Sequence, residues 1–246
     1  MKPSISVVIP AFNEEKNLKA AVLDLLAVID RWFDSYEIII LNDGSTDQTG
    51  RIADHIASRN PNIQVVHQPR NMGLGFNVLS GFQKATKEYV MWYAGDNGML
   101  QSSLEEMFKL VGKADIVIPY IANPEFRSKK RRMVSKLYTV ILNYLTGLKL
   151  KYYNGIVIYR TELVKSINIP TNGFACLAEV LIRAIKSGAT YVEVATRHRL
   201  RGYKTSKAFR IKNLIEITKA LVWLCRSRPT PKMKTKPVLV STKGQY

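Results

Sequence analysis

Short apolar runs alternate with helical patterns through residues 1–120 of this 246-residue chain. The runs are rich in Val, Ile and Tyr and are bounded by turn residues, which is typical of buried strands. They lie at 5–9, 37–41, 64–67, 89–93 and 115–119. Apolar residues at helical spacing predict helices between them, at 18–29, 47–59, 74–87 and 101–111. Strands that alternate with helices indicate an α/β fold, with a mostly parallel sheet covered by helices on both faces.

The pattern becomes less regular after residue 120. It predicts helices at 133–148 and 175–187, strands at 156–159 and 191–194, and a final amphipathic helix at 209–225. Pro, Lys and Thr dominate the residues from 229 onward, a composition typical of disorder. We therefore expect one α/β domain over 1–207, an amphipathic helix within 208–228 and a basic tail over 229–246.

Cysteine usage and hydropathy narrow the class of protein. The two cysteines, Cys176 and Cys225, lie far apart and lack the spacing of metal ligands, which excludes a disulfide scaffold and a cysteine-based zinc module. The first apolar run is too short for a signal peptide, and no apolar stretch approaches the roughly 18 residues of a spanning helix. We expect a protein that is soluble or peripheral to a membrane, in a reducing compartment.

The formal net charge of +18 comes from two blocks. Residues 127–151 contain eight Lys or Arg and no acid, residues 197–246 contain fourteen against one acid, and the rest of the chain is slightly acidic. Such concentration predicts a localised surface for anions: nucleic acid, anionic lipid headgroups or a phosphorylated substrate. The plain alternative is a solvated face and a basic tail. Because no zinc module or RRM motif is present, we expect no specific binding of nucleic acid.

The carboxyl ends of the early strands carry polar or glycine-containing turns, where ligands bind in parallel sheets. The first strand leads to Phe12, whose ring can stack on a base, and to Glu14, which can also simply begin a helix. The second leads to Asn42 and Asp43, which can bind a base or ribose. Glycines after the third strand, Gly73 among them, allow a ligand to approach the backbone.

The fourth strand ends at Asp96, which lies between Gly95 and Gly98. A carboxylate in this position can hold a divalent cation, since Mg²⁺ needs one or two protein carboxylates and takes its other oxygens from phosphate and water.

Together these four strand ends resemble the family 2 glycosyltransferases, nucleotide-sugar enzymes of the GT-A fold. The family's Pro-x-Tyr/Phe-Asn-Glu is matched from Pro10 to Glu14, and its Asp-Asp-Gly-Ser-x-Asp appears from Asn42 to Asp47 with the first Asp replaced. Its Asn-x-Gly-x-Gly is matched from Asn71 to Gly75. Its Asp-x-Asp falls on Ala94-Gly95-Asp96, so only the second carboxylate is present.

Later segments are similar to the dolichol-phosphate mannose synthase-like subgroup. The matches are Arg131 to Ser135, Gly155 to Arg160, an acid at Glu179, and Arg201 to Lys207, including Ser206. The resemblance covers residues 4–210.

The resemblance implies an inverting transfer of a hexose from a GDP- or UDP-sugar to a polyprenyl phosphate, either dolichyl or undecaprenyl. It assigns Asp96 to a catalytic Mg²⁺ or Mn²⁺, and Glu179 and Arg201 to catalysis. It assigns the acceptor phosphate to Arg131, Ser135, Ser206 and Lys207. It assigns the nucleotide to Pro10, Phe12, Glu14, Asn42, Asp43, Asn71 and Gly73.

The implied phosphate-binding cations fall inside the two basic blocks, together with the amphipathic helices. We therefore expect a cytoplasmic enzyme held at the cytosolic face of an anionic membrane, since each basic residue near such a surface contributes about 1 kcal/mol. The apolar helix faces could instead pack on the sheet or form a homo-oligomer. Two other functions stay open: transfer to a saccharide or protein hydroxyl, with Glu179 as base, and a nucleotide-sugar-binding module without catalysis, suggested by Ala94.

Overall fold

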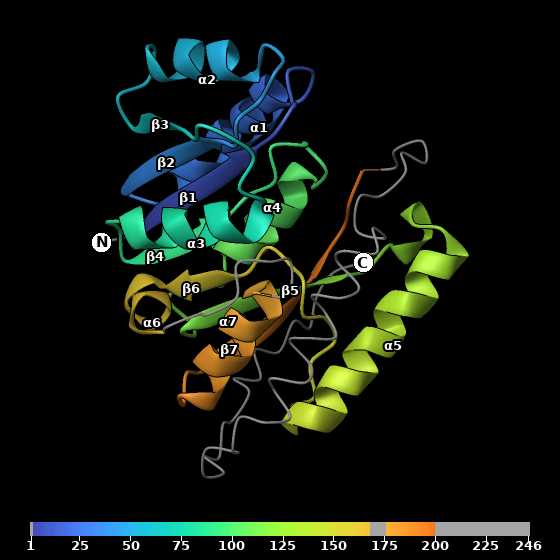
Figure 1. Cartoon of the computed structure of the whole chain (residues 1–246). Coiled ribbons are helices and arrows are strands. Elements are labelled where there is room, and N and C mark those ends of the chain that lie inside the picture. The colour runs from blue at the N-terminus through green and yellow to red at the C-terminus, as the bar shows by residue number, and fades with distance from the viewer. Residues whose placement is uncertain (1, 168–175, 200–246) are drawn as a thin grey trace.

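The alternating apolar runs form one seven-stranded sheet in the computed structural model, which describes residues 2–167 and 176–199 (Figure 1). The strand order is β3-β2-β1-β4-β6-β5-β7. The strands are β1 (Ser4–Ala11), β2 (Ser35–Asn42), β3 (Ile63–His67), β4 (Tyr89–Trp92), β5 (Ile116–Ile121), β6 (Ile158–Arg160) and β7 (Tyr191–Thr196).

Six of these strands run in the same direction. β1 is parallel to β2 and β4, β2 is parallel to β3, and β5 is parallel to β7. β6 is antiparallel to both β4 and β5, so these two run the same way. The carboxyl ends of the six strands therefore lie at one end of the sheet, where β6 begins. We call this the carboxyl end of the sheet.

Helices cover both faces of the sheet. α1 (Leu18–Trp32), α2 (Thr49–Ala57) and α4 (Gln101–Phe108) pack into one core, while α3 (Leu74–Lys84), α6 (Thr161–Ser166) and α7 (Cys176–Lys186) pack into the other. Strand residues alternate between them: Val7 of β1 points into the first core and Val8 into the second. This is the period of two that a sheet buried on both faces requires. The predicted α/β fold with a mostly parallel sheet is confirmed.

The long helix α5 (Lys129–Thr146), preceded by the short 3-10 helix η1 (Pro124–Phe126), lies apart from the other helices (Figure 1). It begins four residues before the predicted start at 133, because the hydroxyl of Ser128 accepts a hydrogen bond from the backbone N–H of Arg131 at 3.4 Å. It ends at Gly147, whose φ of +73° suits glycine. Only Leu142 of this helix is fully buried.

The other predicted elements are present with ends shifted by a few residues, and α6 was not predicted. The predicted helix at 209–225 and the basic tail at 229–246 lie outside the described residues.

Candidate active site at the carboxyl end of the sheet

The segments that follow β1 and β2 are joined by short hydrogen bonds. The backbone N–H of Asn13 donates to the hydroxyl of Ser45 at 3.1 Å, and the Asn13 side-chain oxygen accepts from the backbone N–H of Thr46 at 3.0 Å. The N–H of Glu14 donates to the hydroxyl of Thr49 at 2.8 Å. Asn13 adopts a φ of +55°, which asparagine tolerates better than most residues. The two predicted nucleotide-binding segments therefore form one rigid unit.

Asp43 fixes the segment that follows β3. Its buried carboxylate accepts hydrogen bonds from the backbone N–H groups of Met72 at 2.7 Å and Gly73 at 3.0 Å. Gly44 has a φ of +65°, and a Cβ there would lie 2.5 Å from the carbonyl carbon of Arg70. The Asp43-Gly44 turn thus packs directly on the 70–73 segment. This places Asn71 and Gly73 beside Asp43, as expected, and gives Asp43 a positioning role.

Asn42 is held by two partners. Its side-chain oxygen accepts from the N–H of Ser45 at 3.2 Å, so its amide nitrogen faces Nδ1 of His67 at 2.9 Å. Nε2 of His67 bonds Asp54 at 3.0 Å. An amide that donates to Nδ1 leaves Nε2 as the donor to Asp54. Asn42 therefore orders the end of β3.

The other predicted nucleotide-binding residues lie at the same end of the sheet. Pro10 is within β1, and Phe12 and Glu14 follow it with half-buried side chains. The Glu14 carboxylate accepts from the side-chain amide of Asn17 at 2.7 Å. Gly73 has a φ of +93° with open space where a Cβ would be. Backbone conformation alone, not crowding, thus requires glycine there.

Asp96 and His198 approach one another because the segments after β4, β5 and β7 are tied together. The N–H of Gly98 donates to Asp96 at 3.0 Å, and the N–H of Arg199 donates to the carbonyl of Gly98 at 2.9 Å. The side chain of Asn123 bonds both the carbonyl and the N–H of His198, at 2.8 and 2.9 Å. The short segments between these bonds fix Asp96 and His198 relative to each other.

The imidazole of His198 is neutral at physiological pH. Burial and the charges of Arg127 and Arg131 together lower its pKa to about 4, although the charge of Asp96 acts in the opposite direction. The ring stacks on Phe126 with centroids 5.0 Å apart. A neutral imidazole beside a carboxylate offers a nitrogen lone pair to a metal ion.

Two arginines, Arg127 and Arg131, lie near Asp96 and His198. Arg131, the predicted phosphate ligand, interacts electrostatically with Asp96, and its pKa is lowered by burial and by the neighbouring charge of Arg127. Arg127 lies 5.0 Å from the ring centre of Phe126 and 5.7 Å from that of Tyr152, and it donates to the Tyr152 hydroxyl at 3.3 Å. We call Asp96, His198, Arg127, Arg131 and Tyr152 the Asp96 cluster.

The residues of the Asp96 cluster fit a divalent cation bound together with phosphate. Asp96 supplies oxygen, His198 supplies nitrogen, and the side-chain oxygen of Asn97 is buried with no hydrogen-bond partner in the described part of the chain. Within residues 2–167 and 176–199 no three His, Cys, Asp or Glu side chains form a complete metal site. Water and substrate phosphate can supply the remaining ligands, and the arginines can share the charge of the phosphate. A nitrogen ligand suits a transition ion such as Mn²⁺ better than Mg²⁺.

The remaining predicted residues are distributed as follows. Ser135 lies one turn beyond Arg131 and lines a second cavity, described below. Glu179 is 1% exposed in the first turn of α7, where its carboxylate pairs with Arg183 at 2.8 Å. Arg201, Ser206 and Lys207 lie outside the described residues.

The sequence-based reasoning missed Arg127, Tyr152 and His198. His198 had a signal: it follows the last parallel strand, so its segment meets the others at the carboxyl end of the sheet. For Arg127 and Tyr152 the only sequence signal was position: Arg127 begins the basic block 127–151, and Tyr152 directly follows it.

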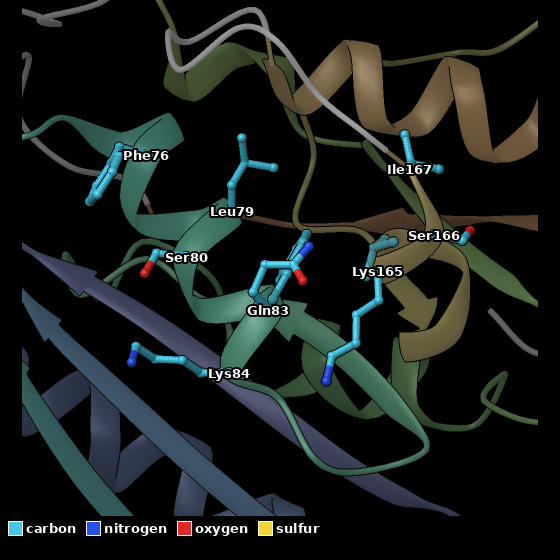
Figure 2. Close-up of a pocket in the computed structure, with 10 residues that line it drawn as sticks. Phe76, Leu79, Ser80, Gln83, Lys84, Lys165, Ser166 and Ile167 are labelled. Atoms are coloured by element: carbon cyan, nitrogen blue, oxygen red, sulfur yellow. The ribbon is translucent and has the colours of Figure 1, made fainter.

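A cavity of about 670 Å³ lies elsewhere in the described structure. It is lined by residues of α3, among them Phe76, Leu79 and Lys84, and by Lys165, Ser166 and Ile167 at the end of α6 (Figure 2). None of the predicted site residues lines it. The convergence of polar groups, and not cavity size, therefore identifies the candidate active site.

Comparison with known proteins identifies the family of the chain. The model of the family described as glycosyl transferase family 2 matches residues 6–168. A dolichyl-phosphate beta-glucosyltransferase of Trichomonas vaginalis is 30% identical over 136 residues, 51% of this chain and 40% of that protein. An undecaprenyl-phosphate 4-deoxy-4-formamido-L-arabinose transferase of Pectobacterium carotovorum is 31% identical over 170 residues, 67% of this chain and 51% of that protein. The matches thus span about half the length of these curated relatives or less.

A solved structure shows the same fold. Glucosyl-3-phosphoglycerate synthase of Mycobacterium tuberculosis, in complex with Mn²⁺, UDP and phosphoglyceric acid, superposes with a TM-score of 0.70 at 18% identity. The superposition covers 91% of this chain and 78% of that one. The same enzyme has been solved with Mg²⁺ and UDP. In this chain, no helix of the described residues is both long and apolar enough to cross a membrane.

Proposed function

Because the chain belongs to glycosyl transferase family 2, we propose that it transfers a hexose, with inversion, from a GDP- or UDP-sugar to a polyprenyl phosphate. The observation that carries this proposal is the pair of arginines, Arg127 and Arg131, beside Asp96. The transferases from Trichomonas vaginalis and Pectobacterium carotovorum, named for polyprenyl-phosphate acceptors, support the choice of acceptor.

The donor binds across the segments after β1 to β4. Phe12 and Glu14 contact the base and ribose, and Pro10, Asn42, Asp43, Asn71 and Gly73 shape the nucleotide site. The hydrogen bonds within these segments hold the site in place before the donor arrives, which lowers the entropy lost on binding.

Asp96 and His198 would hold a divalent cation, Mn²⁺ in preference to Mg²⁺, and the cation would supply positive charge to the diphosphate. Arg131 and Arg127 stabilise the negative charge that grows on the diphosphate as the sugar departs. Arg201, Ser206 and Lys207 belong to the same phosphate-binding set by resemblance.

The reaction is a single displacement. A phosphate oxygen of the acceptor attacks the anomeric carbon, and the bond from that carbon to the donor diphosphate breaks. The electron pair of that bond leaves with the nucleoside diphosphate. Because a phosphate monoester is already ionised near neutral pH, it needs cations to position it and no strong base. The burial of Glu179 against Arg183 agrees with this, since a base must reach the acceptor.

The enzyme works at the cytosolic surface of an anionic membrane, with α5 as its contact. Four apolar residues of α5 recur along one face and are more than half exposed: Met133 (68%), Leu137 (59%), Val140 (55%) and Tyr144 (87%). The first half of the helix carries five Lys or Arg and no acid. An apolar stripe with cations beside it matches an interface of lipid tails and anionic headgroups.

Membrane binding is tested by flotation with vesicles of phosphatidylglycerol and phosphatidylcholine. Leu137→Glu combined with Val140→Glu should abolish binding, whereas Leu23→Glu should not. Leu23 is the matched control because it is an equally exposed leucine on α1, at 54%. Binding should weaken with salt. Equal flotation of both variants would exclude α5 as the contact.

The function is tested by a screen of UDP- and GDP-sugars against undecaprenyl and dolichyl phosphate with Mn²⁺ or Mg²⁺. Glycolipid formation is the expected result. Transfer to a soluble sugar hydroxyl instead, with full dependence on Glu179, would favour a hydroxyl acceptor. Nucleotide-sugar binding without turnover on any acceptor would indicate a binding module.

A further inference from the structure

A cavity of about 410 Å³ lies between α5 and the segment that leads from α5 to β6. α5 contributes Arg132, Ser135 and Lys136 to its wall, and the segment before β6 contributes Lys151 and Tyr152. Arg127, Tyr120 and Thr139 complete its polar lining. We call it the α5 cavity. Asp96, His198 and Arg131 do not line it.

The α5 cavity has a positively charged lining. Arg127, Arg132, Lys136 and Lys151 line it and no Asp or Glu does, and none of the four forms a salt bridge with a described residue. Glu193 accepts a hydrogen bond from the backbone N–H of Lys151 at 2.8 Å and interacts electrostatically with the Lys151 side chain, but its carboxylate lies outside the lining. Four like charges around one cavity repel each other until an anion enters.

Aromatic rings hold two of these cations in place. Nζ of Lys151 lies 4.1 Å from the centre of the Tyr120 ring, and the Arg127 guanidinium lies against Tyr152. Such contacts orient a cation without neutralising it. Nε of Arg127 is buried and has no hydrogen-bond partner among the described residues. The cavity therefore presents two oriented cations and one unpaired guanidinium donor, which suit the oxygens of a phosphate group.

The cavity adjoins the Asp96 cluster. Consecutive residues of a helix point about 100° apart, so Arg131 is directed towards Asp96 while Arg132 lines the cavity. Arg127 serves both regions, because it lines the cavity and its charge acts on His198. A phosphate in the cavity would thus be a neighbour of the donor diphosphate. Val140 and Leu150 give the cavity an apolar wall for the carbon chain attached to that phosphate.

We propose that the α5 cavity binds the phosphate monoester of the acceptor, and that Arg132, Lys136 and Lys151 are its phosphate-binding residues in addition to Ser135. This rests on the proposed function, since it names the acceptor subsite of the same reaction. The phosphate could belong to a lipid or to a soluble phosphate ester, and the experiment separates the two.

Binding is measured without donor, by calorimetry with farnesyl phosphate in detergent and with glycerol 3-phosphate in buffer. Arg132→Ala combined with Lys136→Ala, and separately Lys151→Ala, should weaken phosphate binding at least tenfold. Binding of UDP and GDP should stay within twofold of the unaltered protein. Lys149→Ala is the matched control, because Lys149 is exposed two residues from Lys151 and does not line the cavity. Lys136→Arg should retain binding.

Tighter binding of farnesyl phosphate identifies a lipid as the source, and equal binding of both probes identifies the phosphate group alone. The proposal is overturned if the unaltered protein binds neither probe, or if the cavity variants bind as well as Lys149→Ala. Because the readout is binding and not transfer, a missing glycolipid product would refute the proposed function while leaving this subsite intact.

Discussion

At one side of the carboxyl end of the sheet, after β1, β2 and β3, polar groups bond one another. Asn13 bonds Ser45 and Thr46, and Asp43 bonds the backbone of 72–73. At the other side, around η1, α5 and the start of β6, cations lie against aromatic rings, with Arg127 between Phe126 and Tyr152. The polar groups of the first side bond one another, whereas the cations of the second side form no salt bridge with a described residue.

This difference determines what each side can bind. Internally bonded loops present a fixed shape, which suits a rigid base and ribose. Cations without a salt bridge to a described residue are stabilised when an anion binds, which suits phosphates of donor and acceptor. Substitutions on the two sides test this division.

Asp96→Asn should reduce turnover by about 10²–10³-fold. It removes the carboxylate charge that would hold the cation, and the cation would stabilise the departing diphosphate. The fold should survive, since the side chain is partly exposed and contributes little packing. Glycolipid synthesis with Mn²⁺ measures the effect, and circular dichroism serves as the control. Activity near that of the unaltered enzyme, both in this variant and in EDTA, would refute the metal role.

His198→Ala should raise the Mn²⁺ concentration needed for half-maximal activity by about 10–100-fold, the range expected when support of a metal site is lost. Titration of activity with Mn²⁺ is the measurement. His55→Ala, an exposed histidine on α2, provides the comparison. An unchanged Mn²⁺ requirement would remove His198 from the site.

Gly44→Ala should destabilise the fold by more than the roughly 1–2 kcal/mol that a left-handed backbone costs, because the new Cβ would lie 2.5 Å from the Arg70 backbone. Gly112→Ala isolates the backbone contribution, since Gly112 has a φ of +86° with nothing within 4 Å. Urea unfolding of both variants measures the difference. Equal losses would show that the turn after β2 does not depend on this close approach.

Glu179→Gln should lower turnover per folded molecule by less than about tenfold, well under the 10²–10⁴-fold typical of a general base. Stability should fall, because Arg183 loses its partner. Arg183→Gln breaks the same pair while keeping the carboxylate, so the two variants should have similar activity. A far larger loss in Glu179→Gln alone would assign Glu179 as the base and favour a hydroxyl acceptor.

Much of the fold was predictable because its signals are local. Apolar runs such as Ile5–Ile9 are too short for helices, and the spacing of apolar residues from Leu18 to Ile29 fits a helix and not a strand. The ends of elements were less predictable, because caps decide them. Ser128 begins α5 four residues early through one side-chain hydrogen bond.

The candidate site was predictable where a residue follows a parallel strand, as Asp43 and Asp96 do. The roles of the individual residues within the site were less predictable. Asp43 supports the loop after β3 and Asn42 orders His67, which depends on contacts between residues 25–30 positions apart.

The sequence by itself determined the α/β class, the place of the chemistry at the strand ends and the concentration of positive charge in two blocks. Each follows from local spacing or composition, which no tertiary contact can alter. Only the tertiary structure decided that His198 joins Asp96, although 102 positions separate them. It also decided that Arg131 interacts with Asp96 while Arg132 lines the α5 cavity, and that the side chains of Arg127 and Lys151 lie against aromatic rings. These outcomes depend on the pairing of distant strands and on the direction in which α5 leaves the sheet.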